Sequence, residues 1–299
     1  MVTAQLTPAG VGMHEVLIAT DFSHYSDVAL QLGLQLAHDY QAKAYVCSVV
    51  PAGEFLLAGP EAYVAAKDAT RRDLLQLKDE LKRSHSYMDG RDYYLYLLEG
   101  DVSQALLDFA DQHGIDLIVI GTHGRKGLGK ILMGSVAEHV FRQSPVPVLT
   151  IGPHVNHVER RRSLRNVFVP VDFTAASEQA VPYAAALARE RDATLTALHV
   201  IEPAALKSVP DHARLMEQTR TRLAELLSRE AKGVRCAIRV ETGRVQSVIL
   251  SVADELKADL LVMGVRPWNR VLDHLRWPHA YEVVRESACP VVTVRGATG

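Results

Sequence analysis

The chain has 299 residues, with 33 Lys and Arg against 35 Asp and Glu, a formal net charge of −2, and 48% hydrophobic residues. This length indicates two domains of ordinary size, and the near-neutral charge argues against a dedicated nucleic-acid binder. The three cysteines lack disulfide or zinc-ligand spacing, and no apolar run is long enough to cross a bilayer. We therefore expect a cytoplasmic protein with no nucleic-acid and no membrane partner.

Strands and helices alternate through the first half of the chain. Apolar runs predict buried strands at residues 16–20, 44–50, 92–98, 116–121 and 145–151. Helices are expected to follow Ser23, a suitable N-cap, and to cover residues 61–84, 101–113 and 135–143. The first helix should bury a stripe formed by Val28, Leu32 and Leu36. This alternation predicts an α/β fold with a parallel sheet, helices on both faces and the common strand order 3-2-1-4-5.

The second half repeats the first. Residues 16–37 align with residues 167–188, and a further alignment pairs the stretch from Gly100 with the stretch from Gly243. We therefore expect two tandem five-stranded parallel-sheet domains. The predicted boundaries are a first domain at 1–152, a linker at 153–166 and a second domain at 167–299. The linker is rich in arginine, which indicates a solvated connection, with an anion-binding patch as the alternative.

A glycine-rich loop follows the fourth strand. In open sheets of this kind, ligands bind outside the carboxyl ends of the strands where the strand order reverses, here between the first and fourth strands. The loop covers residues 121–134 and leads into Ser135. Glycines allow close approach to the backbone, and free amides that end at a helix N-terminus bind anions. We expect Ser135 to be the N-cap of the next helix and to offer its hydroxyl to a phosphate.

Other residues near this loop could also take part. Arg125, Lys126 and Lys130 add positive charge, and Gly127 is a further loop glycine. Asp21, at the end of the first strand, is placed to accept a hydrogen bond from a ribose hydroxyl or an adenine amine; its alternative role is that of a turn or capping aspartate. The spacings of a Walker loop and of a dinucleotide fingerprint are absent.

The spacing Gly121-x-x-Gly124-x9-Gly134-Ser135 resembles the nucleotide signature G-2x-G-9x-G-[S/T] of the universal stress proteins. The resemblance covers both halves and implies a tandem universal stress protein that binds ATP in the crevice described above. Matched position by position, it implies contacts of Asp21 with adenosine, of the Val49 backbone with adenine and of Gly121 with ribose. It also implies phosphate contacts of Gly124, Gly134 and Ser135. Ser48 and Ala19 depart from the His and Pro that members often carry.

The matching loop of the second half has lost this pattern. The residues that replace Gly124, Gly127, Gly134 and Ser135 are Pro267, Arg270, Trp277 and Pro278. Proline has no backbone N–H, and tryptophan fills the space that a phosphate needs. Asp172 and the pair His199-Val200 keep the adenine side of the pattern, so an adenine could still be tolerated although the triphosphate cradle is lost. We therefore expect no tight ATP binding in the second half and about one ATP per chain.

Three functions compete. The first is an ATP-binding stress-response or signalling module, with or without Mg²⁺ and with AMP or a cyclic nucleotide as alternative ligands. The second is a slow ATPase or phosphotransferase, disfavoured because no general base and no Mg²⁺-binding acidic pair can be named. The third is a nucleotide-independent dimeric scaffold. The resemblance also implies that the fifth strands of the two halves pair in an intrachain pseudo-dimer, and a homodimer of whole chains is compatible with this.

An additional segment in the first half and two cysteines also have expected roles. The extra segment at residues 51–60 carries Phe55, which either closes over the crevice, meets a partner or packs at the edge of the core. Cys47 and Cys289 lie in or beside apolar strands and are expected to be inert core thiols.

Overall fold

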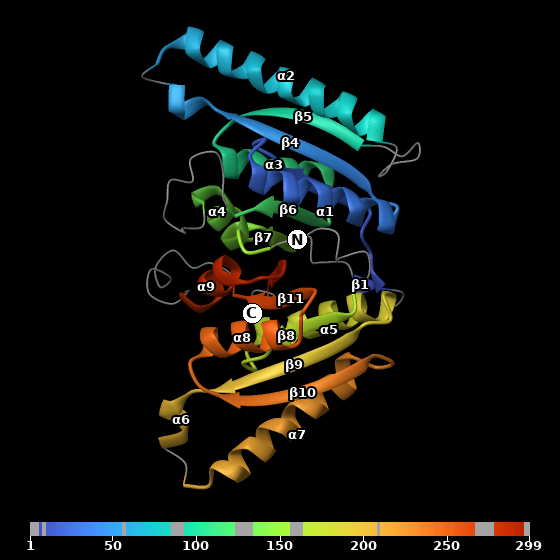
Figure 1. The fold of residues 1–299 in the computed structure, drawn as a ribbon, viewed down its shortest axis with the longest axis vertical. Helices are drawn as coiled ribbons and strands as arrows, with labels where there is room; N and C mark the ends of the chain where they lie inside the picture. The colour runs from blue at the N-terminus through green and yellow to red at the C-terminus, as the bar shows by residue number, and fades with distance from the viewer. Residues whose placement is uncertain are drawn as a thin grey trace. The chain divides into compact units, whose positions relative to one another are not determined.

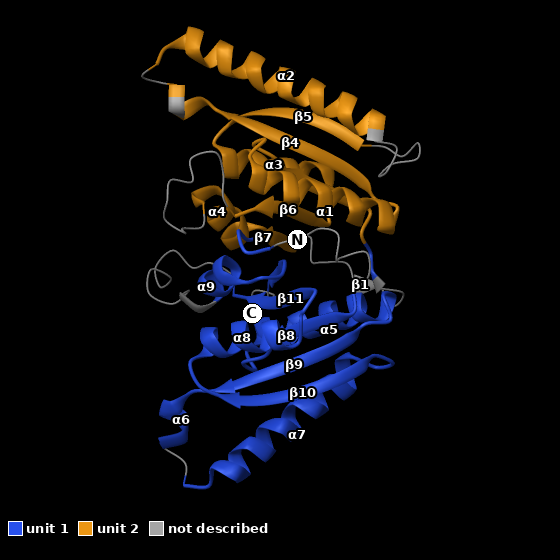
Figure 2. Cartoon of the chain, viewed as in Figure 1, with its two compact units in different colours: residues 1, 3–12, 152–299 blue, residues 2, 13–151 orange. Residues whose placement is uncertain are grey.

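A computed structural model describes residues 6–7, 10–55, 58–84, 93–122, 134–155, 164–207, 210–266 and 278–295. The chain divides into two compact units, coloured separately in Figure 2. Unit 2 comprises residues 2 and 13–151, and unit 1 comprises residues 1, 3–12 and 152–299. The segment 3–12 thus groups with the C-terminal half, although it directly precedes the first strand of the N-terminal half. No described helix combines the length and apolarity needed to cross a bilayer.

Unit 2 is a five-stranded parallel sheet with the order β5-β4-β3-β6-β7 (Figure 1). This confirms the predicted order 3-2-1-4-5. The strands are β3 (Glu15–Ala19), β4 (Lys43–Pro51), β5 (Tyr93–Gly100), β6 (Leu117–Gly121) and β7 (Val148–Ile151). The helices are α1 (His24–Tyr40), α2 (Pro60–Ser84), α3 (Val102–His113) and α4 (Ser135–Gln143), with a 3₁₀ turn η1 at Ala52–Phe55.

Unit 1 repeats this sheet in the order β10-β9-β8-β11-β12, again parallel throughout. Its strands are β8 (Asn166–Pro170), β9 (Thr194–Ile201), β10 (Arg235–Thr242), β11 (Leu260–Val265) and β12 (Val291–Arg295). Its helices are α5 (Ala175–Glu190), α6 (Pro203–Lys207), α7 (His212–Glu230), α8 (Val245–Glu255) and α9 (Pro278–Glu286). A short antiparallel hairpin, β1 (Leu6–Thr7) with β2 (Gly10–Val11), also contributes to this unit.

Asp116 and Asp259, which occupy the same position in the two repeats, have the same structural role. Asp116 accepts hydrogen bonds from the backbone N–H groups of His14 (2.7 Å) and Glu15 (3.0 Å), which fixes the start of β3. Asp259 does the same at the start of β8, with donor distances of 2.8 and 2.9 Å. In each unit this carboxylate ties the start of the fourth strand to the start of the first, so that their far ends arrive side by side at the candidate site.

The predicted stripe of α1 is wrong by about one residue. Val28, Leu32 and Leu36 are only half-buried, and the buried positions are instead Ser26, Ala29, Leu30, Gly33, Leu34 and Ala37. The reason is close packing on β3, because a Cβ at Gly33 would lie 2.7 Å from Cγ1 of Ile18. The helix therefore places Gly33 directly against the strand. Ser23 caps α1 as predicted, accepting from the Ser26 N–H at 3.3 Å.

Candidate functional site

Several predicted site residues gather at the carboxyl edge of the unit 2 sheet. Asp21 follows β3, Gly121 ends β6, and Val49 lies near the end of β4. The Gly134 N–H donates to the Thr122 carbonyl at 2.6 Å, which brings the start of α4 to the end of β6. The remaining predicted residues, namely Gly124, Arg125, Lys126 and Gly127, lie outside the described residues.

Asp21 belongs to a tight turn between β3 and α1. One of its carboxylate oxygens accepts from the Ser23 N–H at 3.0 Å. The Thr20 N–H donates to the Cys47 carbonyl at 2.9 Å, and the Thr20 hydroxyl oxygen accepts from the Phe22 N–H at 3.1 Å. The turn role that we gave as the alternative for Asp21 is therefore present. It is compatible with ligand contact, because a carboxylate offers about four acceptor positions.

The turn holds Phe22 in the left-handed region, with φ of 59°, and Phe173 has the same φ in unit 1. This region costs a non-glycine residue on the order of 1–2 kcal/mol, so the hydrogen bonds of the turn must hold it in place. Sequence reasoning assigned Phe22 no role. The signal was available, because the Asp-Phe pair is identical in both repeats.

Packing against α1 favours a glycine at position 121. A Cβ at this position would lie 3.0 Å from the carbonyl oxygen of Tyr25 in the first turn of α1. The equivalent Gly264 is tighter still, since its Cβ would lie 2.0 Å from the carbonyl oxygen of Ala176. Unit 1 keeps this glycine although its loop has lost the others. Helix packing is therefore sufficient to explain a glycine at the end of the fourth strand.

The prediction that Ser135 is the N-cap of α4 is wrong. Gly134 is the N-cap, with an extended backbone (φ −61°, ψ 141°), and its carbonyl accepts from the Glu138 N–H at 3.0 Å. A Cβ at Gly134 would lie 3.2 Å from the Thr122 carbonyl oxygen, so the strand end favours glycine in the cap position. Ser135 is the first helical residue and is exposed. First-turn amides have no partner within the helix, and such amides suit an anion.

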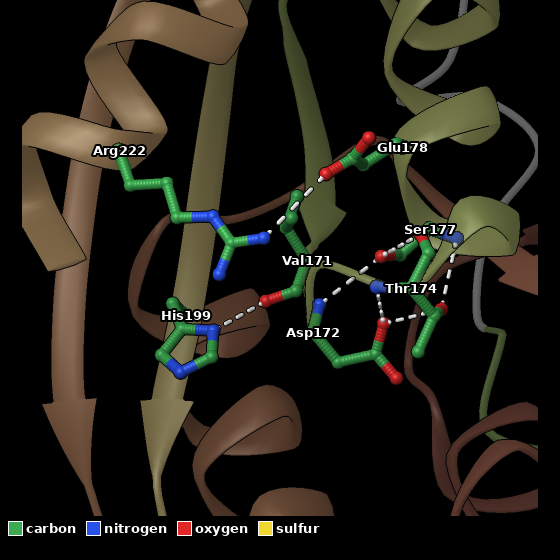
Figure 3. A network of polar contacts seen from close by, with 7 residues as sticks. All are labelled: Val171, Asp172, Thr174, Ser177, Glu178, His199 and Arg222. Carbon is green, nitrogen blue, oxygen red and sulfur yellow. Dashed lines mark hydrogen bonds and ion pairs between the residues drawn. The ribbon is translucent and has the colours of Figure 1, made fainter.

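The equivalent turn of unit 1 is a compact polar network (Figure 3). Asp172 Oδ1 accepts from the Thr174 N–H at 3.0 Å and from the Thr174 hydroxyl at 2.6 Å, and the Asp172 N–H donates to Ser177 Oγ at 3.2 Å. Partial removal of this carboxylate from water raises its pKa. Hydrogen bonds from Ser177 and Thr174, together with the charge of Arg266, outweigh that effect and hold the pKa of Asp172 below its usual value.

Two side chains of unit 1 pack against Phe173 in this turn. The rings of Phe173 and His199 have centroids 4.8 Å apart, and the Arg222 guanidinium lies 3.9 Å from the Phe173 ring centroid. Arg222 also lies 3.9 Å from the Glu178 carboxylate, and His199 Nδ1 donates to the Val171 carbonyl at 2.7 Å (Figure 3). Burial lowers the pKa of His199 below its ordinary value, despite the hydrogen bond to the Val171 carbonyl and the charge of the nearby Asp172. Unit 1 thus covers Phe173 with its own side chains.

Unit 2 differs from unit 1 at the position of His199 and at the first residue of the helix that follows the loop. Ser48 stands where unit 1 has His199, and its side chain is buried and too small to stack on Phe22. Pro278 is the first residue of α9, as Ser135 is the first residue of α4, which supports the alignment of the two loops. A proline at this position lacks the N–H that a serine supplies. Pro267, Arg270 and Trp277 lie outside the described residues.

Three further predicted features can be located. Phe55, in η1, makes an edge-on contact with Tyr63 of α2, with ring centroids 6.0 Å apart, in agreement with packing at the core edge.

Cys47 and Cys289 are buried as predicted, and burial raises the pKa of the Cys47 thiol far above its usual value. Within the described part of the chain, no group of three or more His, Cys, Asp or Glu side chains is arranged to hold a metal ion.

Comparison with known proteins gives matches in both halves. The model of the universal stress protein family matches residues 13–152 and 163–295. A universal stress protein of Mycolicibacterium smegmatis is 25% identical over 293 residues, 94% of this chain and 96% of that protein. One of Methanocaldococcus jannaschii is 29% identical over 138 residues, 46% of this chain and 81% of that protein. The crystal structure of a universal stress protein from Archaeoglobus fulgidus covers 95% of this chain and 96% of its own, with a TM-score of 0.72 at 20% identity, which shows a shared fold.

Proposed function

Because the chain belongs to the universal stress protein family, we propose that it is an ATP-binding stress-response or signalling module whose N-terminal unit binds the nucleotide. The binding place is the carboxyl edge of the sheet, between the ends of β3 and β6. The observation that carries this proposal is the junction of β6 and α4. There, the two ends of the glycine–serine spacing, Gly121 and Gly134-Ser135, meet at a strand end and a helix start.

Each residue has a role in this proposal. Asp21 accepts from the ribose or adenine, the backbone of Val49 meets the adenine ring, and Gly121 lies beside the ribose. The phosphates are bound by backbone amides and charges of the loop and of the first turn of α4, namely Gly124, Arg125, Lys126, Gly127, Gly134 and Ser135. Mg²⁺ would accompany the phosphates as part of the bound nucleotide, and AMP or a cyclic nucleotide would use the same adenosine contacts.

The proposal includes one nucleotide per chain. In unit 1, His199 and Arg222 lie against Phe173, and Pro278 removes an amide at the helix start. The missing amide acts against a phosphate, whereas Asp172 and His199 retain the adenine side of the family's pattern. Titration calorimetry with ATP should therefore give a stoichiometry near one, and a clear value of two would contradict the assignment of binding to unit 2 alone.

Two aspartates provide a matched test of the site. Asp21→Asn keeps an oxygen that can accept from the Ser23 N–H, so the turn is retained while the charge is lost. A hydrogen bond to a charged group contributes about 1.5–3 kcal/mol, so ATP affinity should fall roughly tenfold to hundredfold. Asp172→Asn, the same change at the repeat position of unit 1, should leave the affinity unchanged. No loss of affinity in Asp21→Asn would exclude the proposed contact, and equal losses in both variants would contradict binding in unit 2 alone.

Two measurements distinguish the alternatives. Acid release and identification of co-purified nucleotide separates a nucleotide-binding module from a nucleotide-independent dimeric scaffold, and also tells ATP from AMP or a cyclic nucleotide. Turnover with excess Mg-ATP separates a signalling module from a slow ATPase or phosphotransferase. Pairing of the two fifth strands in an intrachain pseudo-dimer, dimerisation of whole chains and a cytoplasmic location stay predictions.

A further inference from the structure

Helix α5 is buried on a face that its counterpart in unit 2 leaves partly open. All six residues at 183–188 are buried, whereas the same window of α1, residues 32–37, contains three half-buried positions. The three positions that differ are Tyr183, Ala186 and Leu187, with exposures of 2%, 4% and 5%. They share one stripe of the helix with Glu190, because residues three, four and seven apart lie on the same face. The two helices are repeats of each other, so the additional burial requires a cover that α1 lacks.

That cover includes the N-terminal hairpin. Both β1 and β2 contact α5, and Val11 of β2 is only 8% exposed. The Val11 N–H donates to Glu190 Oε1 at 2.6 Å, at the end of the same stripe. The hairpin has only two residues in each strand, and hairpins of this size are not stable alone in water. The hairpin must therefore be stabilised by its contacts with α5.

We propose that the outer face of α5 is a docking surface for the chain's own N-terminal segment. The described strands of this segment, β1 and β2, belong to unit 1, as α5 does. Removing the segment should loosen α5 in unit 1 while leaving α1 in unit 2 unaffected.

Hydrogen exchange on the full chain tests this proposal. In the wild type, the Val11 amide should exchange slowly. Glu190→Ala removes its acceptor, and Glu190 is exposed, so the fold should be retained. A hydrogen bond to a carboxylate is worth about 1.5–3 kcal/mol, which corresponds to exchange roughly tenfold to hundredfold faster. Asp39→Ala, at the same repeat position of α1, is the matched control and should leave the Val11 rate unchanged.

Deletion of residues 1–12 gives the second arm. It should speed the exchange of amides in the 183–190 stretch of α5 and leave the 32–39 stretch of α1 at the wild-type rate. Rapid exchange of Val11 in the wild type, or unchanged exchange of α5 after the deletion, would overturn the proposal. Protection of Val11 that increases with protein concentration would also overturn it, because the occupant of α5 would then be the hairpin of a second copy.

Discussion

The glycine at the end of the fourth strand allows the sharpest comparison between the two units. In Gly264→Ala, the new Cβ would lie 2.0 Å from the Ala176 carbonyl oxygen and 2.6 Å from Cα of Ser177. Both are backbone atoms of the first turn of α5, so no side chain can rotate away. Contacts below about 3 Å are not tolerated, and the helix start must therefore move by about 1 Å. Overpacking of this kind costs typically 1–3 kcal/mol, and we expect the upper end of that range.

Gly121→Ala is the milder change at the same repeat position. Its Cβ would lie 3.0 Å from the Tyr25 carbonyl oxygen, so a shift of a few tenths of an ångström suffices. We expect a cost near the lower end of the range, about 1 kcal/mol. Native-state hydrogen exchange under increasing urea reads the stability of β11 and of β6 separately in one sample. A larger loss for Gly121→Ala than for Gly264→Ala would refute the packing explanation.

Three further predictions follow from single contacts. Ser23→Ala should cost about 1 kcal/mol in urea unfolding because a cap is lost, whereas Ser135→Ala should change stability by less than about 0.5 kcal/mol because Ser135 makes no cap hydrogen bond. The folded chain lowers the pKa of His199 below 6.5, so the unfolded chain binds a proton first. Unit 1 should therefore lose stability as the pH falls below about 6.5, and His199→Ser, which introduces the residue of unit 2, should flatten this loss measured between pH 7 and pH 5. Exposed Cys236 should react with a thiol reagent under native conditions, while buried Cys47 should react only after unfolding, which mass spectrometry can follow.

The sheet and most helix bounds could be predicted from the sequence because their signals are local. The run at residues 16–19 is apolar at every position because its strand is covered on both faces, and Val16, Leu17 and Ile18 have no exposed surface. The bounds of α4 at residues 135 and 143 agree with the prediction, since a glycine-rich stretch precedes it and a Pro-containing turn follows it. Because the second half repeats the sequence pattern of the first, the same order of strands and helices was predicted there.

The candidate site was predictable only in part. The glycine spacing pointed to the end of β6 and the start of α4, which do meet. The cap of α4 was placed one residue late, because the choice between Gly134 and Ser135 depends on the Thr122 carbonyl. The glycine spacing also could not show whether a glycine is needed for ligand binding or for helix packing. At Gly121, packing against the first turn of α1 favours glycine.

The sequence by itself determined the alternation of strands and helices, the duplication and the position of the glycine loop, because each of these depends only on the order and polarity of residues along the chain. Only the tertiary structure decided which side of α1 faces β3, that Arg222 and His199 cover Phe173, and that the hairpin lies against α5. These contacts join residues far apart in the chain, such as Val11 and Glu190. Their energies depend on shape and distance after folding, and no local pattern of residue types records either.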